Sequence, residues 1–582
     1  MLRQALELAP TSKIILSTDA HFFPETYWLG LRQLRESLEK VLVSYVEAGD
    51  FSVSQAINIA TDLLFWNSNS LYNLNEERKY PHLLTACGRS TEEPPTLVNG
   101  TPESPQSKRT ESSLRLSSRS TLRDQPIDSL EDEGSAFTTV DTFFSKNPDI
   151  RYVWFQWIDY TNTMRRKMMP VGEFVDTVKK QKRIGAPMAI LRMLQRDYIA
   201  PGGTATGQLL FSIDVSTLSR NKGLPAEAAP SATVQTFWHE DRPGSIKDAP
   251  HLEGCPRWSL QRQVEAAESE FGLSLLMGFE IEIIFMKPVK DPETGYIKEF
   301  VSVTDMHSWC NMTYAQLDIL PMIEEIVETL AASGIHLPQF HSEAAPGQWE
   351  FILPPYPPLQ SVDNLYRART IIGNIARKHG LKATVYPRPF DFTCGTACHA
   401  HFSISDATYE TCWLAGILDH LPSILAFTLP VLASYERVKG GIWAGGEWVT
   451  WGWQNKEVPL RKVEDGRFEM KTVDGMANGY FAMASVIAAG LDGIRNRKPL
   501  IHKDCKFDAS QIDEETRKNL GITTRLPNTL HKALEILKAD ELMNKELGEG
   551  FIENYIATKL EEDRMLGAMT PEGARKFLME RY

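Results

Sequence analysis

Three short stretches of the chain repeat charged or imidazole side chains at every second position: Glu280-x-Glu282, His399-x-His401 and Arg467-x-Glu469-x-Lys471. In a β-strand, alternate side chains share one face, so each set points the same way. The residues between them are apolar, among them Phe279, Ile281 and Phe402. This alternation predicts strands with one buried face and one face that carries charge.

A fourth segment, HSEAAPGQWE, brackets a Pro-Gly turn with Glu343 and Glu350. Together the four segments offer five carboxylates and one or two imidazoles to one pocket. Two carboxylates about 4 Å apart repel by roughly 4 kcal/mol at an effective dielectric near 20, so such a pocket needs cations. Oxygen ligands favour magnesium or manganese over zinc or copper, and a pair of such ions suits phosphoryl transfer. The alternative interpretation is a set of solvated strand faces with ordinary surface charges.

The composition is that of an ordinary globular protein: 582 residues, 42% hydrophobic and 24% charged, enough for two or more domains. The net charge of -13 argues against a nucleic-acid or anionic membrane partner. Seven scattered cysteines without a CxxC pair predict free thiols in a reducing compartment. Because neither a secretory signal nor an apolar run of bilayer length is found, we expect a cytoplasmic protein.

The chain changes character several times along its length. Residues 89–136 are rich in Ser, Thr, Pro and charge, which predicts a disordered linker because such a segment cannot bury enough apolar surface. Hydrophobic periodicity predicts a strand over 13–19 and a hairpin over 151–171 with Asn162 near its turn. It also predicts helices over 29–46, 54–65, 257–271, 362–379, 482–491 and 530–547. Polar and glycine-rich sequence precedes residue 250.

Five motifs resemble the glutamine synthetase family, in the same order and at similar separations. They are GFEIEIIF, EAAPGQWEF, CGTACHAHFS, SYERV and RFEMKTVDGMANGYFAMASVIAAGLDGI, within about residues 140 to 570. The resemblance implies an α+β fold, with an N-terminal beta-grasp domain (137–250) and a larger antiparallel-sheet catalytic domain with C-terminal helices (251–582). It also implies a homo-oligomeric ring with active sites between neighbouring subunits.

Residues 13–74 carry a second resemblance, to the final strand and helices of an amidohydrolase barrel. Fungal developmental proteins join such a barrel to a glutamine-synthetase-like half, and this chain resembles that fusion. Residues 1–88 are therefore expected to be a remnant of the barrel, with Asp19 as its strand-eight carboxylate. Either the barrel has degenerated or the chain begins partway through a longer protein.

The resemblance to glutamine synthetases also assigns roles to single residues. It places one metal ion on Glu282, Glu343 and Glu350 and the other on Glu280, His399 and Glu469. The cofactors are then ATP and two Mg²⁺ or Mn²⁺ ions. It places the nucleotide on His401, Ser403, Arg461 and Arg467, the bound glutamate on Gly395 and Arg437, and the catalytic cations at Arg437, Lys456, Arg461 and Lys471.

The implied activity is an ATP-dependent ligase that joins the side-chain carboxylate of glutamate to ammonia or an organic amine through a gamma-glutamyl phosphate. For ammonia this is glutamine biosynthesis, a step of nitrogen metabolism. Several residues have plainer alternatives: His401 as a core histidine, Arg437 as a structural ion pair, and Lys456 or Lys471 as surface charges. The tryptophan-rich segment 441–453 either lines a flap over the substrate or packs in the core.

The chain also departs from the family pattern. Cys394-Gly395-Thr396-Ala397 stands where the family has Asn-Gly-Ser-Gly, and Lys456 and Lys471 stand for arginines whose planar two-pronged geometry lysine lacks. The acidic stretch that serves ammonia in the family is missing, and Asp197 is a candidate substitute. The alternative function is a catalytically weak or inactive member with a developmental signalling or scaffold role.

Overall fold

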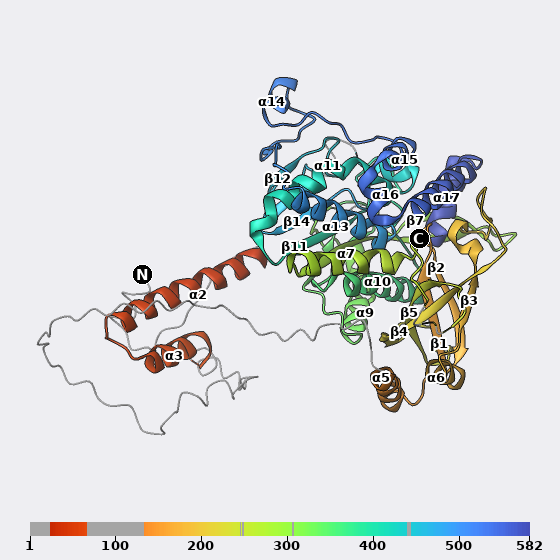
Figure 1. The fold of residues 1–582 in the computed structure, drawn as a ribbon, viewed down its shortest axis with the longest axis horizontal. Helices are drawn as coiled ribbons and strands as arrows, with labels where there is room; N and C mark the ends of the chain where they lie inside the picture. Colours follow the sequence, from red (N-terminus) through yellow and green to blue (C-terminus); the bar gives the residue numbers. More distant parts are fainter. Residues whose placement is uncertain (1–23, 67–132, 245, 247–248, 305–307, 439–443) are drawn as a thin grey trace, which may run out of the picture. The chain divides into compact units, whose positions relative to one another are not determined.

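The computed structural model describes residues 24–66, 133–244, 246, 249–304, 308–438 and 444–582. The chain divides into two compact units, Met1–Arg123 and Asp124–Tyr582 (Figure 1). The strand predicted over 13–19 lies outside the described residues. So does most of the linker predicted over 89–136, whose last residues, 133–136, begin a helix.

The first unit contains α2 (Pro24–Glu47), α3 (Val53–Thr61) and the π-helical turn η2 (Asp62–Trp66). Both helices predicted for this region are confirmed. The Ser52 hydroxyl accepts a hydrogen bond from the Gln55 amide and so caps the start of α3. The buried core described here is small, and it consists of Leu38, Leu42, Ala56 and Leu63.

The second unit begins with α5 (Glu133–Lys146) and a five-stranded sheet in the order β2-β1-β5-β4-β3. The central pair β1–β5 is parallel and the other pairs are antiparallel, which fits the predicted beta-grasp domain. The predicted hairpin is confirmed as β1 and β2, with Asn162 at φ 60° in the turn. The elements are β1 (Tyr152–Ile158), β2 (Met164–Pro170), α6 (Val171–Lys179), β3 (Ile184–Pro187), η4 (Met188–Arg192), β4 (Gln208–Arg220) and β5 (Ser231–Glu240).

A nine-stranded sheet forms the centre of this unit, in the order β12-β13-β14-β11-β6-β9-β8, with β7 and β10 also paired to β6. Every pair is antiparallel except β12–β13. The architecture is α+β, as expected. The strands are β6 (Leu275–Lys290), β7 (Ile297–Ser302), β8 (Gln339–Ser342), β9 (Gln348–Ile352), β10 (Lys382–Thr384), β11 (Cys398–Ile404), β12 (Trp451–Trp453), β13 (Leu460–Glu464) and β14 (Arg467–Met470).

Helices surround this sheet, and those predicted from periodicity are confirmed with one correction. The helix predicted over 530–547 is two helices, because Asp540 ends the first and its carboxylate caps the second by accepting from the Met543 amide. The helices are α7 (Pro256–Phe271), α8 (Tyr314–Leu317), α9 (Leu320–Ala331), α10 (Pro358–Lys378), η6 (Ala407–Tyr409), α11 (Glu410–Thr428), α12 (Leu432–Arg437), α13 (Gly479–Arg495), α14 (Glu514–Asn519), α15 (Leu530–Ala539), α16 (Glu541–Leu547), α17 (Glu549–Gly567) and α18 (Pro571–Arg581).

The packing of α11 against α13 shows how tightly the core is built. A Cβ at Gly416 would lie 2.1 Å from the Ala489 carbonyl oxygen, and one at Gly493 would lie 2.0 Å from the Cys412 carbonyl oxygen. Only glycine fits where the two helix backbones come this close. The two helices therefore pack at close-packed density along this contact.

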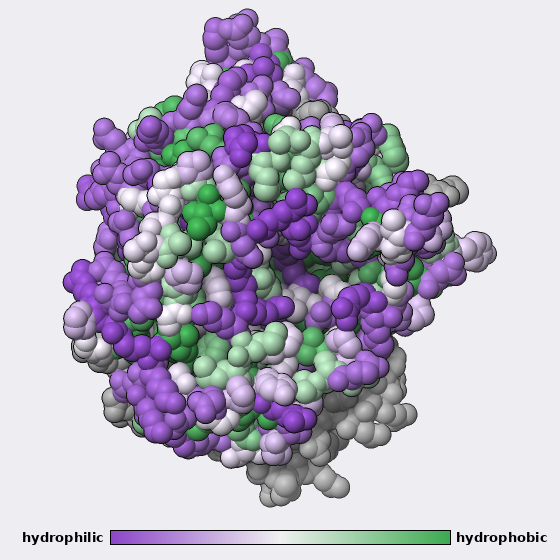
Figure 2. All heavy atoms as spheres, turned by 90° about the vertical axis from the view of Figure 1, so that its right-hand side faces the viewer, coloured by the Kyte–Doolittle hydropathy of each residue, from purple (hydrophilic) through white to green (hydrophobic). Residues whose placement is uncertain are grey.

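One face of the second unit is mostly polar. Figure 2 shows the face on the right of Figure 1, where hydrophilic residues dominate and hydrophobic ones are scattered among them. None of the helices in the described ranges combines the length and the apolar character that a bilayer crossing needs.

Candidate functional site

Most of the predicted site residues lie on adjacent strands of the nine-stranded sheet, β9, β6, β11, β14 and β13, whereas Glu343, Gly395, Arg437, Lys456 and Lys471 lie outside these strands. Residues directly opposite one another on neighbouring antiparallel strands have their side chains in contact range. The strand register therefore forms one continuous row of charged and imidazole groups. Its members are the pairs Glu350 with Glu282, His399 with Glu280, His401 with Glu469, and Arg461 with Glu469.

His399 lies at the centre of this row. Its Nδ1 is 3.1 Å from Glu280 Oε2, 3.7 Å from Glu282 Oε1 and 3.6 Å from Glu469 Oε1. His401 Nε2 is 2.8 Å from Glu280 Oε1, so the Glu280 carboxylate lies between the two imidazoles. The convergence predicted from the sequence is therefore present.

Two carboxylates of the cluster, Glu280 and Glu469, have positively charged partners. Burial alone would raise the pKa of Glu280, but His401 and His399 outweigh it and hold the pKa well below its ordinary value. Burial also opposes ionisation of Glu469, yet Lys471 and the two histidines lower its pKa to about 2. Both side chains are carboxylates at neutral pH.

The other three carboxylates, Glu282, Glu343 and Glu350, repel one another. Burial, together with the negative charges of Glu280, Glu282 and Glu343, raises the pKa of Glu350 well above its ordinary value. Burial raises the pKa of Glu282 too, with Glu343 adding to the effect, and burial raises that of Glu343. Negative charge therefore exceeds positive charge at this end, which favours a bound cation.

Two groups of ligand atoms are close enough to hold a metal ion. Within each group the atoms lie within 4.8 Å of one another: Glu280, Glu350 and His399 in the first, and Glu280, His401 and Glu469 in the second. Glu280 belongs to both. Carboxylate oxygens with one imidazole suit a hard divalent ion, so the donor set fits the predicted metals. The division of six ligands between two ions remains a prediction.

A tight turn between β8 and β9 positions Glu343 and Glu350. Gly347 has φ 73°, and a Cβ there would lie 2.5 Å from the Phe285 carbonyl oxygen. Glu343 Oε2 accepts a hydrogen bond of 2.8 Å from the Ala344 amide. His341 Nε2 lies 3.3 Å from Glu350 Oε1. His341 was not predicted as a site residue, although it stands two positions before Glu343 in the alternating pattern.

Two of the predicted cations reach the cluster. Arg461 Nη1 donates to Glu469 Oε2 at 2.6 Å. Lys471 Nζ is 3.4 Å from both Glu469 Oε1 and His399 Nε2, and only 5% of the residue is exposed. The surface interpretation of Lys471 is therefore wrong.

Arg437 is buried beside the cluster, and its Nη2 donates to the carbonyl oxygens of Lys471 (3.0 Å) and Val473 (3.4 Å). Its Nε is buried with no partner among the described residues. A Cβ at Gly395 would lie 2.6 Å from Arg437 Cγ and 2.2 Å from the Pro387 carbonyl oxygen. A side chain at position 395 would therefore clash with the backbone and with Arg437, so glycine is the residue that fits here.

Gln348 is a site residue that the sequence reasoning missed. Its Nε2 donates to Glu282 Oε2 at 2.7 Å and to the Gly395 carbonyl oxygen at 3.1 Å. It therefore connects a predicted metal ligand to the predicted glutamate site. Its place in the turn motif, two residues before Glu350, was the available signal.

Three predicted site residues lie away from the row. Lys456 is exposed, with Nζ 6.0 Å from the centre of the Trp309 ring. Arg467 is exposed and pairs with Glu464 at 3.2 Å, while Ser403 lies opposite Arg467 in the strand register. Their roles towards phosphate and nucleotide remain predictions.

The remaining sequence candidates have structural partners. Asp197 is exposed and pairs with Arg165 at 2.5 Å within the smaller domain. In the tryptophan-rich segment, Trp443 lies outside the described residues, and the Trp448 ring is 4.6 Å from Arg517 and 5.2 Å from Arg525. This packing favours a structural role for Trp448.

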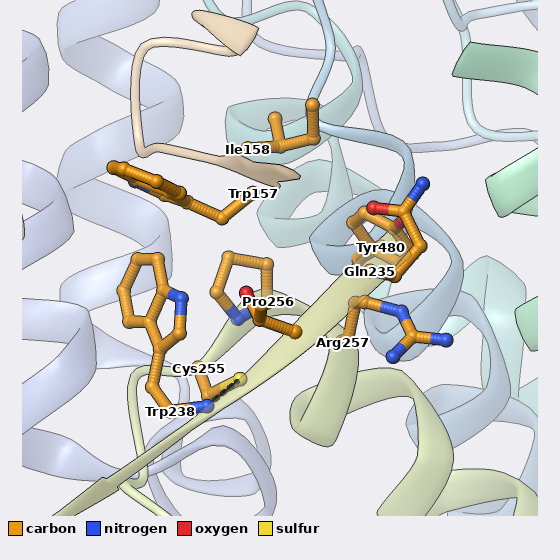
Figure 3. A pocket seen from close by; sticks show the side chains of 9 residues that line it. Trp157, Ile158, Gln235, Trp238, Cys255, Pro256, Arg257 and Tyr480 are labelled. Carbon is orange, nitrogen blue, oxygen red and sulfur yellow. Dashed lines mark hydrogen bonds between the residues drawn. The ribbon is translucent and has the colours of Figure 1, made fainter. Parts of the chain in front are cut away.

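A small cavity lies elsewhere, between the five-stranded sheet and the helices beneath it. Figure 3 shows Trp157 and Trp238 on one side of it and Gln235, Arg257 and Tyr480 on the other. Arg257 is held by Asp214 and Asp363, at 2.9 and 2.8 Å. None of the lining residues is a predicted site residue, so this cavity belongs to the packing between domains.

Comparisons with known proteins agree with the motifs. The family model described as glutamine synthetase, catalytic domain, matches residues 253–572. The chain is 47% identical over its full length to Protein fluG of Emericella nidulans, of which it spans 61%. It is 28% identical over 358 residues to the gamma-glutamylpolyamine synthetase GlnA3 of Streptomyces coelicolor, covering 56% of this chain and 72% of that one.

A solved structure, the GmaS/ADP complex in its conformation 1, has the same fold. The TM-score is 0.61 at 21% identity, and the match covers 75% of this chain and 99% of that one. At this identity the likeness concerns the fold alone.

Proposed function

The chain belongs to the glutamine synthetase family, and on that premise we propose that it is an ATP-dependent ligase joining the side-chain carboxylate of glutamate to ammonia or an organic amine. The observation that carries the proposal is the row of paired glutamates and histidines across β9, β6, β11, β14 and β13. A relative named for gamma-glutamylpolyamine synthesis supports an amine acceptor.

The metal and nucleotide side of the proposal rests on the donor set. One ion is assigned to Glu282, Glu343 and Glu350 and the other to Glu280, His399 and Glu469. When bound, such ions neutralise phosphate oxygens of ATP during phosphoryl transfer. The two groups of ligand atoms within 4.8 Å support a site for divalent ions.

The cationic side chains have complementary tasks. Arg461 and Lys471 contact Glu469, which supports a role in stabilising the negative charge of the transferred phosphate. The Nε of Arg437, which has no partner among the described residues, is a donor for the carboxylate of the bound glutamate, and Gly395 packs directly against the Arg437 side chain. Exposed Lys456 would reach the phosphate from the solvent side.

The proposed reaction has two steps, phosphorylation of glutamate and attack by the amine. A side-chain carboxylate oxygen of glutamate forms a bond to the terminal phosphorus of ATP, and ADP leaves with the electrons of the broken P–O bond. The amine nitrogen then bonds to the carbonyl carbon of the gamma-glutamyl phosphate. An amine bound as its ammonium ion first gives up one proton; after its attack phosphate leaves, and a second proton passes from nitrogen to solvent or to a carboxylate of the site.

The direct test incubates the purified chain with ATP, Mg²⁺, glutamate and a panel of amines that includes ammonia, methylamine, butylamine and putrescine. We expect phosphate release that depends on both glutamate and an amine. The variant Glu350→Gln should lose it, while Glu299→Gln, an exposed glutamate on β7 of the same sheet, should keep it. If every amine leaves phosphate release at the background rate, the proposal fails.

A second candidate is a member that keeps the fold and nucleotide binding but turns over weakly or not at all, with a developmental signalling or scaffold role. The observation that favours it is Lys471, whose ammonium group contacts His399 and Glu469, two ligands assigned to one ion. Restoration of a deletion phenotype by Glu350→Ala protein would support this role, and loss of function would count against it.

The remaining parts of the proposal follow from the family. We expect a homo-oligomeric ring, a cytoplasmic location and a role in nitrogen metabolism, including glutamine biosynthesis if ammonia is the acceptor. The domain limits 137–250 and 251–582 belong to the same proposal, as do the barrel remnant (1–88) and the disordered linker (89–136).

A further inference from the structure

We propose that Trp309 forms the acceptor side of the site and selects an organic primary amine, whose alkyl chain lies on the indole ring while its nitrogen faces Glu343. The inference rests on the proposed ligase function and narrows it from any amine to one larger than ammonia. It starts from the large apolar side chain of Trp309, which is 53% exposed beside a cluster of carboxylates.

The loop that carries Trp309 is fixed to the metal-binding turn. The Cys310 amide donates to the Ser342 carbonyl oxygen at 2.9 Å, and Ser342 Oγ lies 3.5 Å from the Asn311 carbonyl oxygen. Ser342 directly precedes Glu343. Trp309 is therefore held beside the start of the turn that presents Glu343 and Glu350.

Side-chain contacts also place the Trp309 indole next to the turn that presents Glu343 and Glu350. The Trp309 ring lies 6.2 Å from the His341 ring, and His341 Nε2 is 3.3 Å from Glu350 Oε1. The charges of Glu343 and Glu350 add to burial in raising the pKa of the neighbouring Cys310 thiol. The indole therefore lies next to His341, which in turn contacts the Glu350 carboxylate.

A primary ammonium group of the chain itself lies near the Trp309 ring. Lys456 Nζ lies 6.0 Å from the Trp309 ring centre, and its positive charge acts on Glu343. The lysine side chain is a primary alkylammonium group, chemically the same as the proposed acceptor. An indole face attracts such a cation and covers its methylene groups.

Ammonia would gain little from this arrangement. It has no carbon chain to cover an exposed indole, and a hydrated ammonium ion is best held by oxygen atoms. The indole face would attract an ammonium ion as well, but only an acceptor with an alkyl chain also gains apolar contact with the ring.

The experiment compares butylamine with ammonium chloride as ligands for the full chain with ADP and Mg²⁺, measured by calorimetry, and as substrates in steady-state kinetics. We expect Trp309→Ala to weaken butylamine binding, and to raise its KM, about tenfold, which corresponds to about 1.4 kcal/mol. Ammonium binding and the KM values of ATP and glutamate should not change. Trp309→Tyr should recover most of the loss.

Trp453 provides a matched control, because it is 46% exposed and has a lysine, Lys462, with Nζ 5.0 Å from its ring centre. Trp453→Ala should leave butylamine binding unchanged. Equal losses in both variants would overturn the inference, as would a Trp309→Ala protein that binds butylamine normally. A drop in kcat for ammonia and butylamine alike would also overturn it, since Trp309 would then only position Lys456.

The calorimetric binding measurement distinguishes a failure of this inference from a failure of the proposed function. If no amine is ligated but butylamine binding depends on Trp309, the acceptor site stands and the ligase proposal fails. If ammonia is ligated and butylamine neither binds nor reacts, the ligase proposal stands and the acceptor assignment fails.

Discussion

The two ends of the site are built in different ways. At one end, Glu280, His399, His401 and Glu469 lie on three adjacent strands, and their mutual distances follow from the register. At the other end, Trp309 and Lys456 lie outside the strands and are exposed. The strand register fixes the first end, whereas residues of the second end can change without disturbing the sheet. If the proposed roles hold, the acceptor side is the more adaptable half of the site.

The two ends also differ in how strongly positive groups compensate their carboxylates. Histidines and Lys471 keep the pKa of Glu280 and Glu469 low. At Glu343, burial outweighs the positive charges nearby, and at Glu350 burial together with neighbouring carboxylates does so, so both pKa values are raised. Substitutions at each end test this difference between the two parts of the site.

The largest effect is expected for Glu350→Gln. The change removes one predicted metal ligand at the centre of the site, so amine-dependent phosphate release should fall at least about 100-fold. The metal-free protein should not lose stability, because the variant relieves repulsion with Glu282 and Glu343. Rate assays and thermal unfolding with chelator measure the two results. A parallel loss of activity and stability would mean that Glu350 supports the fold rather than the chemistry.

The same substitution has a pH signature. The folded Glu350 carboxyl keeps its proton above the ordinary pKa of 4.5, while the unfolded chain releases it. The metal-free wild type should therefore lose stability as pH rises above about 4.5, until the folded carboxyl also ionises. Glu350→Gln should lack this contribution. Denaturant unfolding from pH 4 to 8 measures the difference between the two proteins, and identical profiles would contradict the assigned pKa direction.

A somewhat smaller loss is expected for Lys471→Met, about 30-fold to 100-fold in turnover, because the variant removes a buried positive charge next to Glu469 and His399. Lys471→Arg should retain more activity than Lys471→Met. Steady-state rates at saturating ATP and glutamate provide the measurement. An active Lys471→Met protein that binds metal more tightly would instead identify Lys471 as a competitor of the second ion.

Gly395→Ala should have an intermediate effect. The added Cβ would lie 2.2 Å from the Pro387 carbonyl oxygen and 2.6 Å from Arg437 Cγ, so the backbone or Arg437 must move. We expect a KM for glutamate about tenfold higher and a lower Tm, with the KM of ATP little changed. Gly373→Ala on α10, where a Cβ meets nothing within 4 Å, is the matched control. Equal behaviour of the two variants would argue against a crowded glutamate site.

The smallest effect is expected for Arg467→Ala. Arg467 is exposed at the start of β14 and pairs with Glu464 at 3.2 Å. A role at ATP should then appear as a KM for ATP raised less than about threefold, since exposed ion pairs contribute little. Nucleotide titration with wild type and variant provides the value. A loss of more than tenfold would place Arg467 in direct contact with phosphate.

The sequence predicted the strand-borne half of the site well, for a physical reason. Alternation fixes which side chains share a face, so the spacing alone pairs Glu280 with Glu282 and His399 with His401. It also predicted the hairpin around Asn162 and the end of α7 at Gly272, where turn chemistry is local.

Other features depend on contacts that no local pattern records. Gln348 joins Glu282 to Gly395 only after the turn folds against the loop before β11. The position of Trp309 depends on a hydrogen bond between Cys310 and Ser342, residues of two separate segments. Strands β4 and β5 lie in sequence whose polar and glycine-rich character predicts neither, because their stability comes from pairing with each other and with β1.

The central claim, phosphorylation of the glutamate side chain followed by amine transfer, is tested most directly with glutamate labelled with oxygen-18 in its side-chain carboxylate. The purified chain is supplied with ATP, Mg²⁺ and butylamine, and the released phosphate is examined by mass spectrometry. We predict one oxygen-18 atom in the phosphate for each amide formed. Phosphate without the label, or release that does not depend on glutamate, would contradict the account.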